Sequence, residues 1–155
     1  MNTQAKKYVL DFLKSQKIGV VSTVLGAQPQ SANVYYTTDE SLNIYFITPV
    51  NCRKYFNIQS NNKVSFVVGT ENPPQTVQVD GTAEVVTDQN TINTVTANYY
   101  AALVKNNQPI PVTKLDVTGG LVVYKITPRW MRWSDFTDMI KKGGYGVTEV
   151  IIDIK

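Results

Sequence analysis

The sequence predicts a mainly β protein: a small antiparallel barrel of six to seven strands, covered by two to three helices. Two observations support this fold class. Short segments rich in β-branched and aromatic residues recur between turn-forming residues, and a few longer segments repeat their apolar residues with the helical period. The chain has 155 residues, of which 43% are hydrophobic and 17% charged, enough to bury one core. We therefore expect a single domain spanning residues 1–155.

The first third of the chain is expected to form a helix followed by three antiparallel strands. Residues 3–15 place apolar side chains such as Tyr8 and Phe12 at helical spacing, with Asn2 or Thr3 as the cap. Turn-forming residues then separate three segments of strand character, as at the start of a β-meander. These strands are predicted at residues 19–24, 28–37 and 43–48.

A short helix is expected after the third strand. Pro49 closes that strand, and the helix begins at Asn51 or Cys52 and ends at residues 61–62. A further strand is predicted at residues 63–69, because β-branched and aromatic residues return there.

Two basic residues, Arg53 and Lys54, fall in the first turn of this predicted helix. Basic side chains oppose the helix dipole at that end, so their presence needs a reason. A bound anion would provide one, because free backbone N–H groups, the positive end of the dipole and a guanidinium group would all attract it. The alternative is a pair of solvated charges on a surface turn.

The middle of the second half should form a long strand and a helix. Residues 76–86 alternate between apolar and polar side chains, with Gly81 at a bulge or at a close approach of two backbones. Asp88 can cap a helix that runs to about Val104. Residues 105–118 contain two prolines and are expected to be irregular.

The C-terminal part is predicted to contain two more strands. Residues 120–127 are apolar on both faces and end at Pro128. A strand without a polar face needs cover on both sides, as in a barrel wall that also meets a partner. A glycine-rich turn at residues 141–146 then precedes a last short strand at residues 148–154.

Composition narrows the function classes. The chain contains no histidine, which excludes Ser-His and Cys-His catalysis, and its single cysteine cannot form an internal disulfide. A net charge of +3 without a basic stripe does not favour nucleic acid, and no apolar run is long enough for a membrane helix. We therefore expect a cytoplasmic protein in which a bound organic cofactor supplies any chemistry.

One pattern around the predicted short helix resembles a known family. It consists of Thr48, Arg53, Lys54, Asn57, Ile58, Asn61, Val64 and Ser65. It is similar to the phosphate-binding segment of the pyridoxamine 5′-phosphate oxidase-like, FMN-binding split-barrel family. Three further segments resemble strands of that family in the expected order, at residues 28–36, 78–85 and 126–130. The resemblance covers roughly residues 15–136.

The resemblance implies a Greek-key-like split β-barrel that forms a homodimer and binds FMN at the subunit interface. Authentic pyridoxamine-phosphate oxidation goes with a C-terminal signature that contains arginine and histidine. Because this chain has no histidine, it resembles instead the general stress protein type of the family.

The resemblance also implies a set of cofactor-binding residues. Arg53 and Lys54 would bind the flavin phosphate, and Cys52 takes the place of the usual hydroxyl residue beside them. Thr48 would donate its hydroxyl to the phosphate or to the pyrimidine edge, and Gln78 would reach the phosphate or the ribityl chain. The remaining expected contacts are backbone groups of one strand and an aromatic side chain: Ala32, Asn33, Val34, Tyr35 and Trp130.

Three questions stay open from the sequence. Trp130 and Trp133 either stack on a planar ligand or anchor a dimer interface, with the interface favoured. Cys52 at a helix N-terminus beside two cations should have a lowered pKa, and it is either oxidisable or simply a small residue in the loop.

The third question is the activity. Hydride or electron transfer through flavin N5 to an unknown small substrate requires no catalytic side chain. The alternatives are a flavin-binding or stress-sensing dimer without turnover, and an F420-dependent reductase of the same fold.

Overall fold

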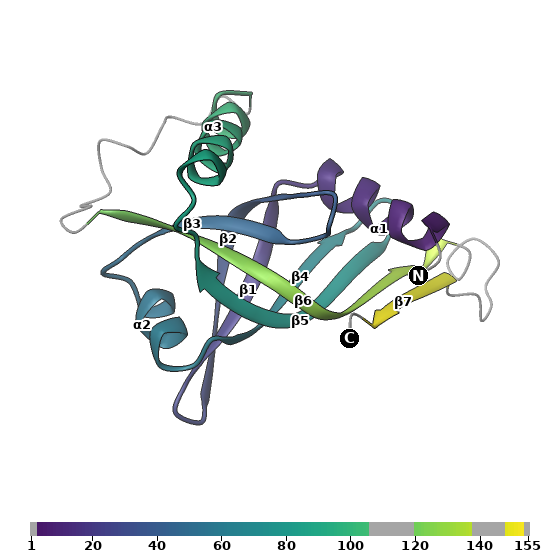
Figure 1. Ribbon diagram of the computed structural model, residues 1–155. Coiled ribbons are helices and arrows are strands. Elements are labelled where there is room, and N and C mark those ends of the chain that lie inside the picture. Colours follow the sequence, from purple (N-terminus) through teal and green to yellow (C-terminus); the bar gives the residue numbers. More distant parts are fainter. Residues whose placement is uncertain (1–2, 106–119, 138–147, 154–155) are drawn as a thin grey trace.

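The computed structural model describes residues 3–105, 120–137 and 148–153, which form three helices and seven strands (Figure 1). The helices are α1 (Thr3–Ser15), α2 (Arg53–Ser60) and α3 (Gln89–Lys105). The strands are β1 (Ile18–Leu25), β2 (Gln28–Thr38), β3 (Ile44–Pro49), β4 (Lys63–Thr70), β5 (Gln75–Val85), β6 (Leu121–Asp135) and β7 (Thr148–Asp153). The irregular segment and the glycine-rich turn that the sequence predicts lie almost entirely outside the described residues.

The strands pair in the order β3-β2-β1-β4-β5-β6-β7, and every pair is antiparallel. A further pairing of β3 with β6 closes the first six strands into a barrel, while β7 extends the sheet along the second half of β6. The step from β1 to β4 makes the order Greek-key-like rather than a simple meander. The predicted mainly β barrel with helical covers is therefore confirmed.

The barrel opens between β2 and β3. These strands pair only where residues 36–38 face residues 44–46, whereas β3 pairs with β6 along its whole length. Within the described residues, the outer edge of β2 from Gln28 to Tyr35 has no strand beside it. This opening is the split of the barrel, and it leaves backbone N–H and C=O groups of β2 free to bind something else.

The prediction that Pro128 ends its strand is wrong, because β6 continues to Asp135. The N–H of Val86 donates to the C=O of Val123, so by alternation the nitrogen of Pro128 faces the opposite edge. On that edge, β6 pairs with β3 up to Ile126 and with β7 only from Trp130. Pro128 lies in the gap between the two partners, so its missing N–H costs no ladder hydrogen bond.

A bulge next to this proline confirms the prediction for Gly81. Asp80 pairs with Trp130 and Gly81 with Pro128, which leaves Arg129 as an extra residue in β6. A Cβ atom on Gly81 would lie 2.4 Å from the carbonyl oxygen of Thr127. The backbones of β5 and β6 thus approach so closely that only glycine fits.

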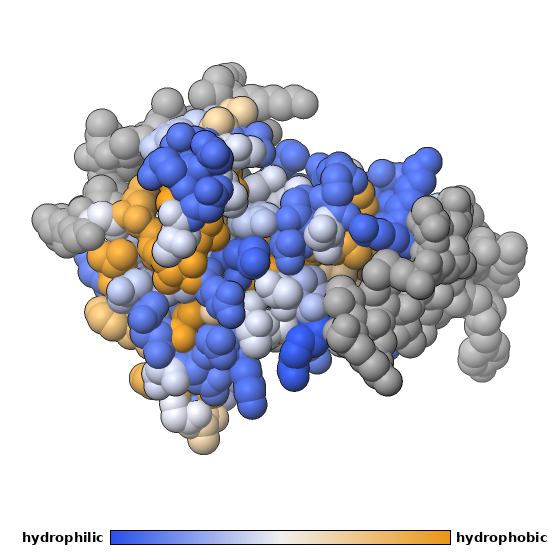
Figure 2. Space-filling model, in the orientation of Figure 1, coloured by the Kyte–Doolittle hydropathy of each residue, from blue (hydrophilic) through white to orange (hydrophobic). Residues whose placement is uncertain are grey.

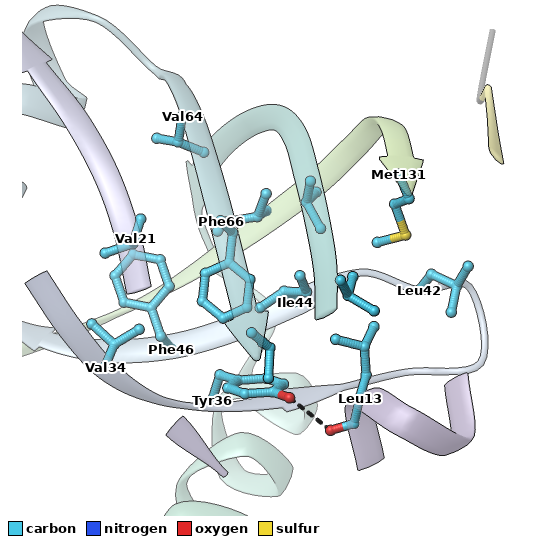
Figure 3. Packing of buried hydrophobic residues seen from close by; sticks show 14 of the residues in the cluster. Leu13, Val21, Val34, Tyr36, Leu42, Ile44, Phe46, Val64, Phe66 and Met131 are labelled. Atoms are coloured by element: carbon cyan, nitrogen blue, oxygen red, sulfur yellow. Dashed lines mark hydrogen bonds between the residues drawn. The ribbon is translucent and has the colours of Figure 1, made fainter. Parts of the chain in front are cut away.

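Helix α1 covers one end of the barrel, and α2 and α3 lie towards the other end (Figure 1). The apolar face of α1 enters the core through Val9 and Leu13, both about fully buried. The Tyr36 hydroxyl of β2 donates a 2.8 Å hydrogen bond to the Leu13 carbonyl and ties the helix to the barrel (Figure 3). No helix in the described part of the chain is long and apolar enough to cross a membrane.

Trp133 belongs to this core as well. Its side chain is 7% exposed and stacks on Tyr8 of α1, with ring centroids 5.7 Å apart and planes at 9°. The Trp133 side chain therefore packs within its own chain. Trp130, which is half-buried, is the tryptophan that remains available to contact a ligand or an interface.

Candidate anion-binding site

The chain enters α2 through Cys52, which occupies the N-cap position in an extended conformation. The N–H groups of Tyr55 and Phe56 donate to the carbonyl of Cys52, at 3.1 and 3.3 Å. The N–H groups of Arg53 and Lys54 precede these bonds and have no acceptor within the helix. In the described part of the chain, these two N–H groups are therefore free donors at the positive end of the helix dipole.

The Cys52 thiol lies between a hydroxyl and an ammonium group. Its Sγ is 3.1 Å from Thr48 Oγ1 and 3.7 Å from Lys54 Nζ. Burial raises the pKa of Cys52, but hydrogen bonds from Thr48 and from the Tyr55 N–H, together with the charge of Lys54, outweigh it and lower the pKa. The direction agrees with the sequence prediction. Thr48 itself is 1% exposed, so its hydroxyl faces the sulfur.

A pocket of about 150 Å³ lies between the start of α2 and the neighbouring ends of β1 and β2. Its lining residues are Thr23, Gln30, Ser31, Ala32, Cys52, Arg53 and Lys54. The structure therefore brings together four of the residues that the sequence assigns to a cofactor, namely Ala32, Cys52, Arg53 and Lys54.

The pocket is positively charged. Among the described residues, Arg53 makes no hydrogen bond and no ion pair, and the Lys54 ammonium contacts only the Cys52 sulfur. No carboxylate in the described ranges pairs with either cation, and both cations lie beside a helix N-terminus. Such an arrangement binds anions, and the guanidinium fork suits a phosphate or a carboxylate.

The open edge of β2 runs away from this pocket. The N–H of Tyr36 donates to the Lys17 carbonyl on the β1 side, so the backbone groups of Tyr35 and Asn33 point to the open edge. By the same alternation the backbone groups of Ala32 and Val34 face β1, and the Val34 side chain is buried in the core. Of the four predicted residues of β2, two therefore present free backbone groups.

Gln78 and Trp130 do not reach the pocket within one chain. Both lie on the outer face of the barrel, where the Gln78 Oε1 atom accepts a 3.0 Å hydrogen bond from Arg132 Nη2. Asn33 and Gln78 are separated by three strand spacings, about 14 Å. The predicted residues thus form two groups, one in the pocket and one on the outer face.

Three polar residues that line the pocket, Thr23, Gln30 and Ser31, were given no cofactor role from the sequence. Asn57 was named only as part of the family pattern; it lies on the buried face of α2 and donates to Thr23 and Gln30. Strand alternation could have found Gln30, because it shares a face of β2 with Ala32. The bond between Asn57 and a residue 27 positions earlier could not be predicted, since it depends on how α2 packs against β1.

A closed six-stranded antiparallel barrel, split between β2 and β3 and with a cationic pocket at the split, places the chain among split-barrel proteins. The family model described as "Pyridoxamine 5'-phosphate oxidase" matches residues 5–133. The chain belongs to this family.

Solved structures share the fold at low sequence identity. General stress protein 26 from Bacillus anthracis is 21% identical, covers 84% of this chain and 94% of its own, and has a TM-score of 0.66. A protein described as FAD-binding from Mesorhizobium loti is 17% identical over 86% of this chain and 94% of its own, with a TM-score of 0.62. A heme-binding protein from Mycobacterium smegmatis is 14% identical over 99% of this chain and 59% of its own, with a TM-score of 0.72. No curated protein matches the chain significantly by sequence.

Proposed function

We propose that the protein binds FMN, with the flavin phosphate in the pocket at the start of α2. The observation that carries the proposal is the pair of cations, Arg53 and Lys54, which line this pocket beside free helix N–H groups and have no carboxylate partner among the described residues. A phosphate dianion fits that charge and those donors.

The open edge of β2 supports a flavin rather than a free phosphate. Ala32 lines the pocket, and Tyr35 lies three residues further along the strand, a distance of about 10 Å. The free backbone groups of Asn33 and Tyr35 lie along this path. They complement the N–H and C=O groups at the pyrimidine end of a flavin ring. The fold neighbour described as FAD-binding also favours a flavin in this architecture.

The chain's own contribution to activity is anchoring and orientation. Arg53 and Lys54 hold the phosphate, and β2 fixes the ring by backbone hydrogen bonds. A bound flavin supplies hydride or electron transfer through N5, for which the protein need not provide an acid or a base. We therefore propose an FMN-dependent oxidoreductase acting on a small substrate. A flavin-binding dimer without turnover and an F420-dependent reductase are the competing functions.

Native mass spectrometry and cofactor titration test this proposal. We expect the purified protein to carry FMN, or to bind added FMN in preference to riboflavin and F420, because only FMN offers both the terminal phosphate and the flavin ring. Sustained NAD(P)H oxidation by the FMN-loaded protein would support an enzyme, and its absence would favour the binding dimer. A colourless protein that ignores FMN contradicts the proposal.

We further propose that a second copy of the chain completes the site. Gln78 and Trp130 lie on the outer face, too far from the pocket of their own chain, but a partner can bring its own copies of them to the ligand. The same face carries exposed apolar side chains, since Ile18 at the start of β1 is 50% and Val67 of β4 is 40% exposed. An apolar sheet face of this kind favours association.

The oligomeric state of a Val67→Lys variant tests this assembly. Val67 lies in register between Val20 and Gln78, so a lysine there would disrupt a dimer that uses this face. The matched control is Leu25→Lys, an exposed apolar position at the end of β1, where the side chain is 53% exposed. We expect V67K to be monomeric and to retain less FMN, and L25K to remain dimeric. A wild-type monomer that binds FMN fully would contradict the proposal.

A further inference from the structure

We propose that Gln30 is a third anion-binding side chain and that the buried Asn57 is the residue that positions its amide. This inference deepens the proposed function, because the anion is taken to be the phosphate of FMN. It is carried by a hydrogen-bond network beneath the pocket.

Asn57 is 2% exposed and projects from α2 towards β1 and β2. Its Nδ2 atom donates to Thr23 Oγ1 at 2.9 Å and to Gln30 Oε1 at 3.1 Å. An amide nitrogen has two hydrogens, and these two bonds use both of them. Both hydrogens of the Asn57 NH₂ group are thus donated to residues that line the pocket.

The Thr23 hydroxyl sets the direction of this network. Thr23 is 4% exposed, and its Oγ1 donates to the backbone carbonyl of Gln30 at 3.4 Å. Because its single hydrogen is used there, the hydroxyl accepts from Asn57 rather than donating to it. This orients the Asn57 amide with its nitrogen towards Gln30, so the Gln30 side chain turns its oxygen towards Asn57.

The consequence is that the Gln30 NH₂ group remains available. The side chain lines the same pocket as Arg53 and Lys54, and its Nε2 atom makes no hydrogen bond to another described residue. Two nearby hydroxyls have partners of their own: Thr23 donates to the Gln30 carbonyl, and Thr48 Oγ1 lies 3.1 Å from the Cys52 sulfur. Gln30 is therefore a neutral side chain of this pocket whose NH₂ group has no acceptor among the described residues and can donate to an anion. The Ser31 hydroxyl, which also lines the pocket, lies 2.8 Å from the Ser22 hydroxyl.

The first test compares FMN with riboflavin, which lacks the phosphate, by calorimetric titration of wild type and Gln30→Met. Methionine keeps the length of the side chain and removes the donor. We expect about a tenfold loss of FMN affinity, typical of one hydrogen bond to a charged group, and no change for riboflavin. Gln89→Met, at an exposed position at the start of α3, is the control and should leave both affinities unchanged.

The second test asks whether Asn57 acts through Gln30. Asn57→Ala should weaken FMN binding in the wild-type background but have little further effect in the Gln30→Met background, because coupled residues are not additive. A purely structural role would give the same loss in both backgrounds. Should Asn57→Ala fail to fold, Thr23→Val serves instead, since it removes the hydroxyl that fixes the Asn57 amide and keeps the shape of the side chain.

Inorganic phosphate separates this inference from the proposed function. If wild type binds phosphate but no flavin, and Gln30→Met weakens phosphate binding, then Gln30 does bind the anion and the proposal that the ligand is FMN is wrong. If wild type binds FMN and Gln30→Met leaves the ratio of FMN to riboflavin affinity unchanged, the inference is overturned and the function stands. Failure of wild type to bind either probe overturns both.

Discussion

The pKa of the Cys52 thiol depends on the electrostatics of the pocket. Burial disfavours a thiolate at this position, yet the Thr48 hydroxyl, the Tyr55 N–H and the Lys54 ammonium stabilise it more strongly, so the pKa is lowered. Those groups also attract any other anion at the start of α2. The thiol, as the only cysteine of the chain, is therefore a chemical probe of the proposed phosphate site.

The pH dependence of Cys52 alkylation is the first prediction. The pH at the midpoint of the alkylation rate reports the pKa of the thiol, because the thiolate is the reactive form, and it should lie below that of an ordinary cysteine. Lys54→Met should raise the midpoint and slow alkylation at neutral pH, since the stabilising charge is removed. Lys63→Met, at an exposed position in β4, should leave it unchanged. Equal midpoints in wild type and Lys54→Met would contradict this account.

At the residue scale, the sequence could predict the pocket only in part. Arg53, Lys54 and Cys52 follow from their position at the start of a helix, which local signals fix. Gln30 and Asn57 are 27 residues apart and meet only because α2 packs on the barrel wall. Such tertiary bonds between neutral side chains leave no periodic signal in the sequence.

Among the elements, the pair β5 and β6 forms a long continuous part of the barrel wall. β6 changes its second partner from β3 to β7 in the middle, and a bulge with Pro128 and Gly81 marks the change. The close backbone contact at Gly81 permits this bend, and it cannot be relieved by a side-chain rotation because the Thr127 carbonyl belongs to the backbone.

Gly81→Ala is therefore expected to destabilise the protein by about 1–3 kcal/mol, the range typical of overpacking. The matched control is Gly69→Ala in β4, where the nearest atom to an added Cβ is 3.7 Å away. That substitution should change the free energy of unfolding by less than about 0.5 kcal/mol. Urea denaturation of the two variants measures both effects. Equal stabilities would show that the bulge tolerates a side chain.

Most elements could be predicted because hydrophobic periodicity and turn residues specify them locally. The extent of β6 could not, since a proline is tolerated there only through a gap between two non-local partners. The turn before β3 is another case. Leu42 adopts a positive φ of 66°, unusual for leucine, and its side chain is fully buried in the core. Burial there outweighs the local backbone preference.

For the molecule as a whole, folding and ligand binding depend on separable parts. The core is formed by the barrel strands and α1, with Ile58 from the buried face of α2, whereas Arg53 is exposed and Lys54 is half-buried at the start of that helix. On the surface, hydrophobic residues gather around the base of α3, at the end of the barrel opposite α1 (Figure 2).

Because Arg53 and Lys54 lie outside the core, their charges can be changed without altering core packing. Acidic residues at the start of α2 would also interact favourably with the helix dipole.

The most direct test of the central claim is the FMN affinity of the Arg53→Glu/Lys54→Glu double variant. The control is Lys6→Glu/Lys7→Glu, which reverses another adjacent basic pair, in α1, and changes the net charge by the same amount. We predict that the pocket variant loses more than about 100-fold in FMN affinity, because two charge-assisted contacts become repulsive, while its melting temperature stays close to wild type. The control should bind FMN normally. Undiminished affinity in a folded pocket variant would contradict an anion site at the start of α2.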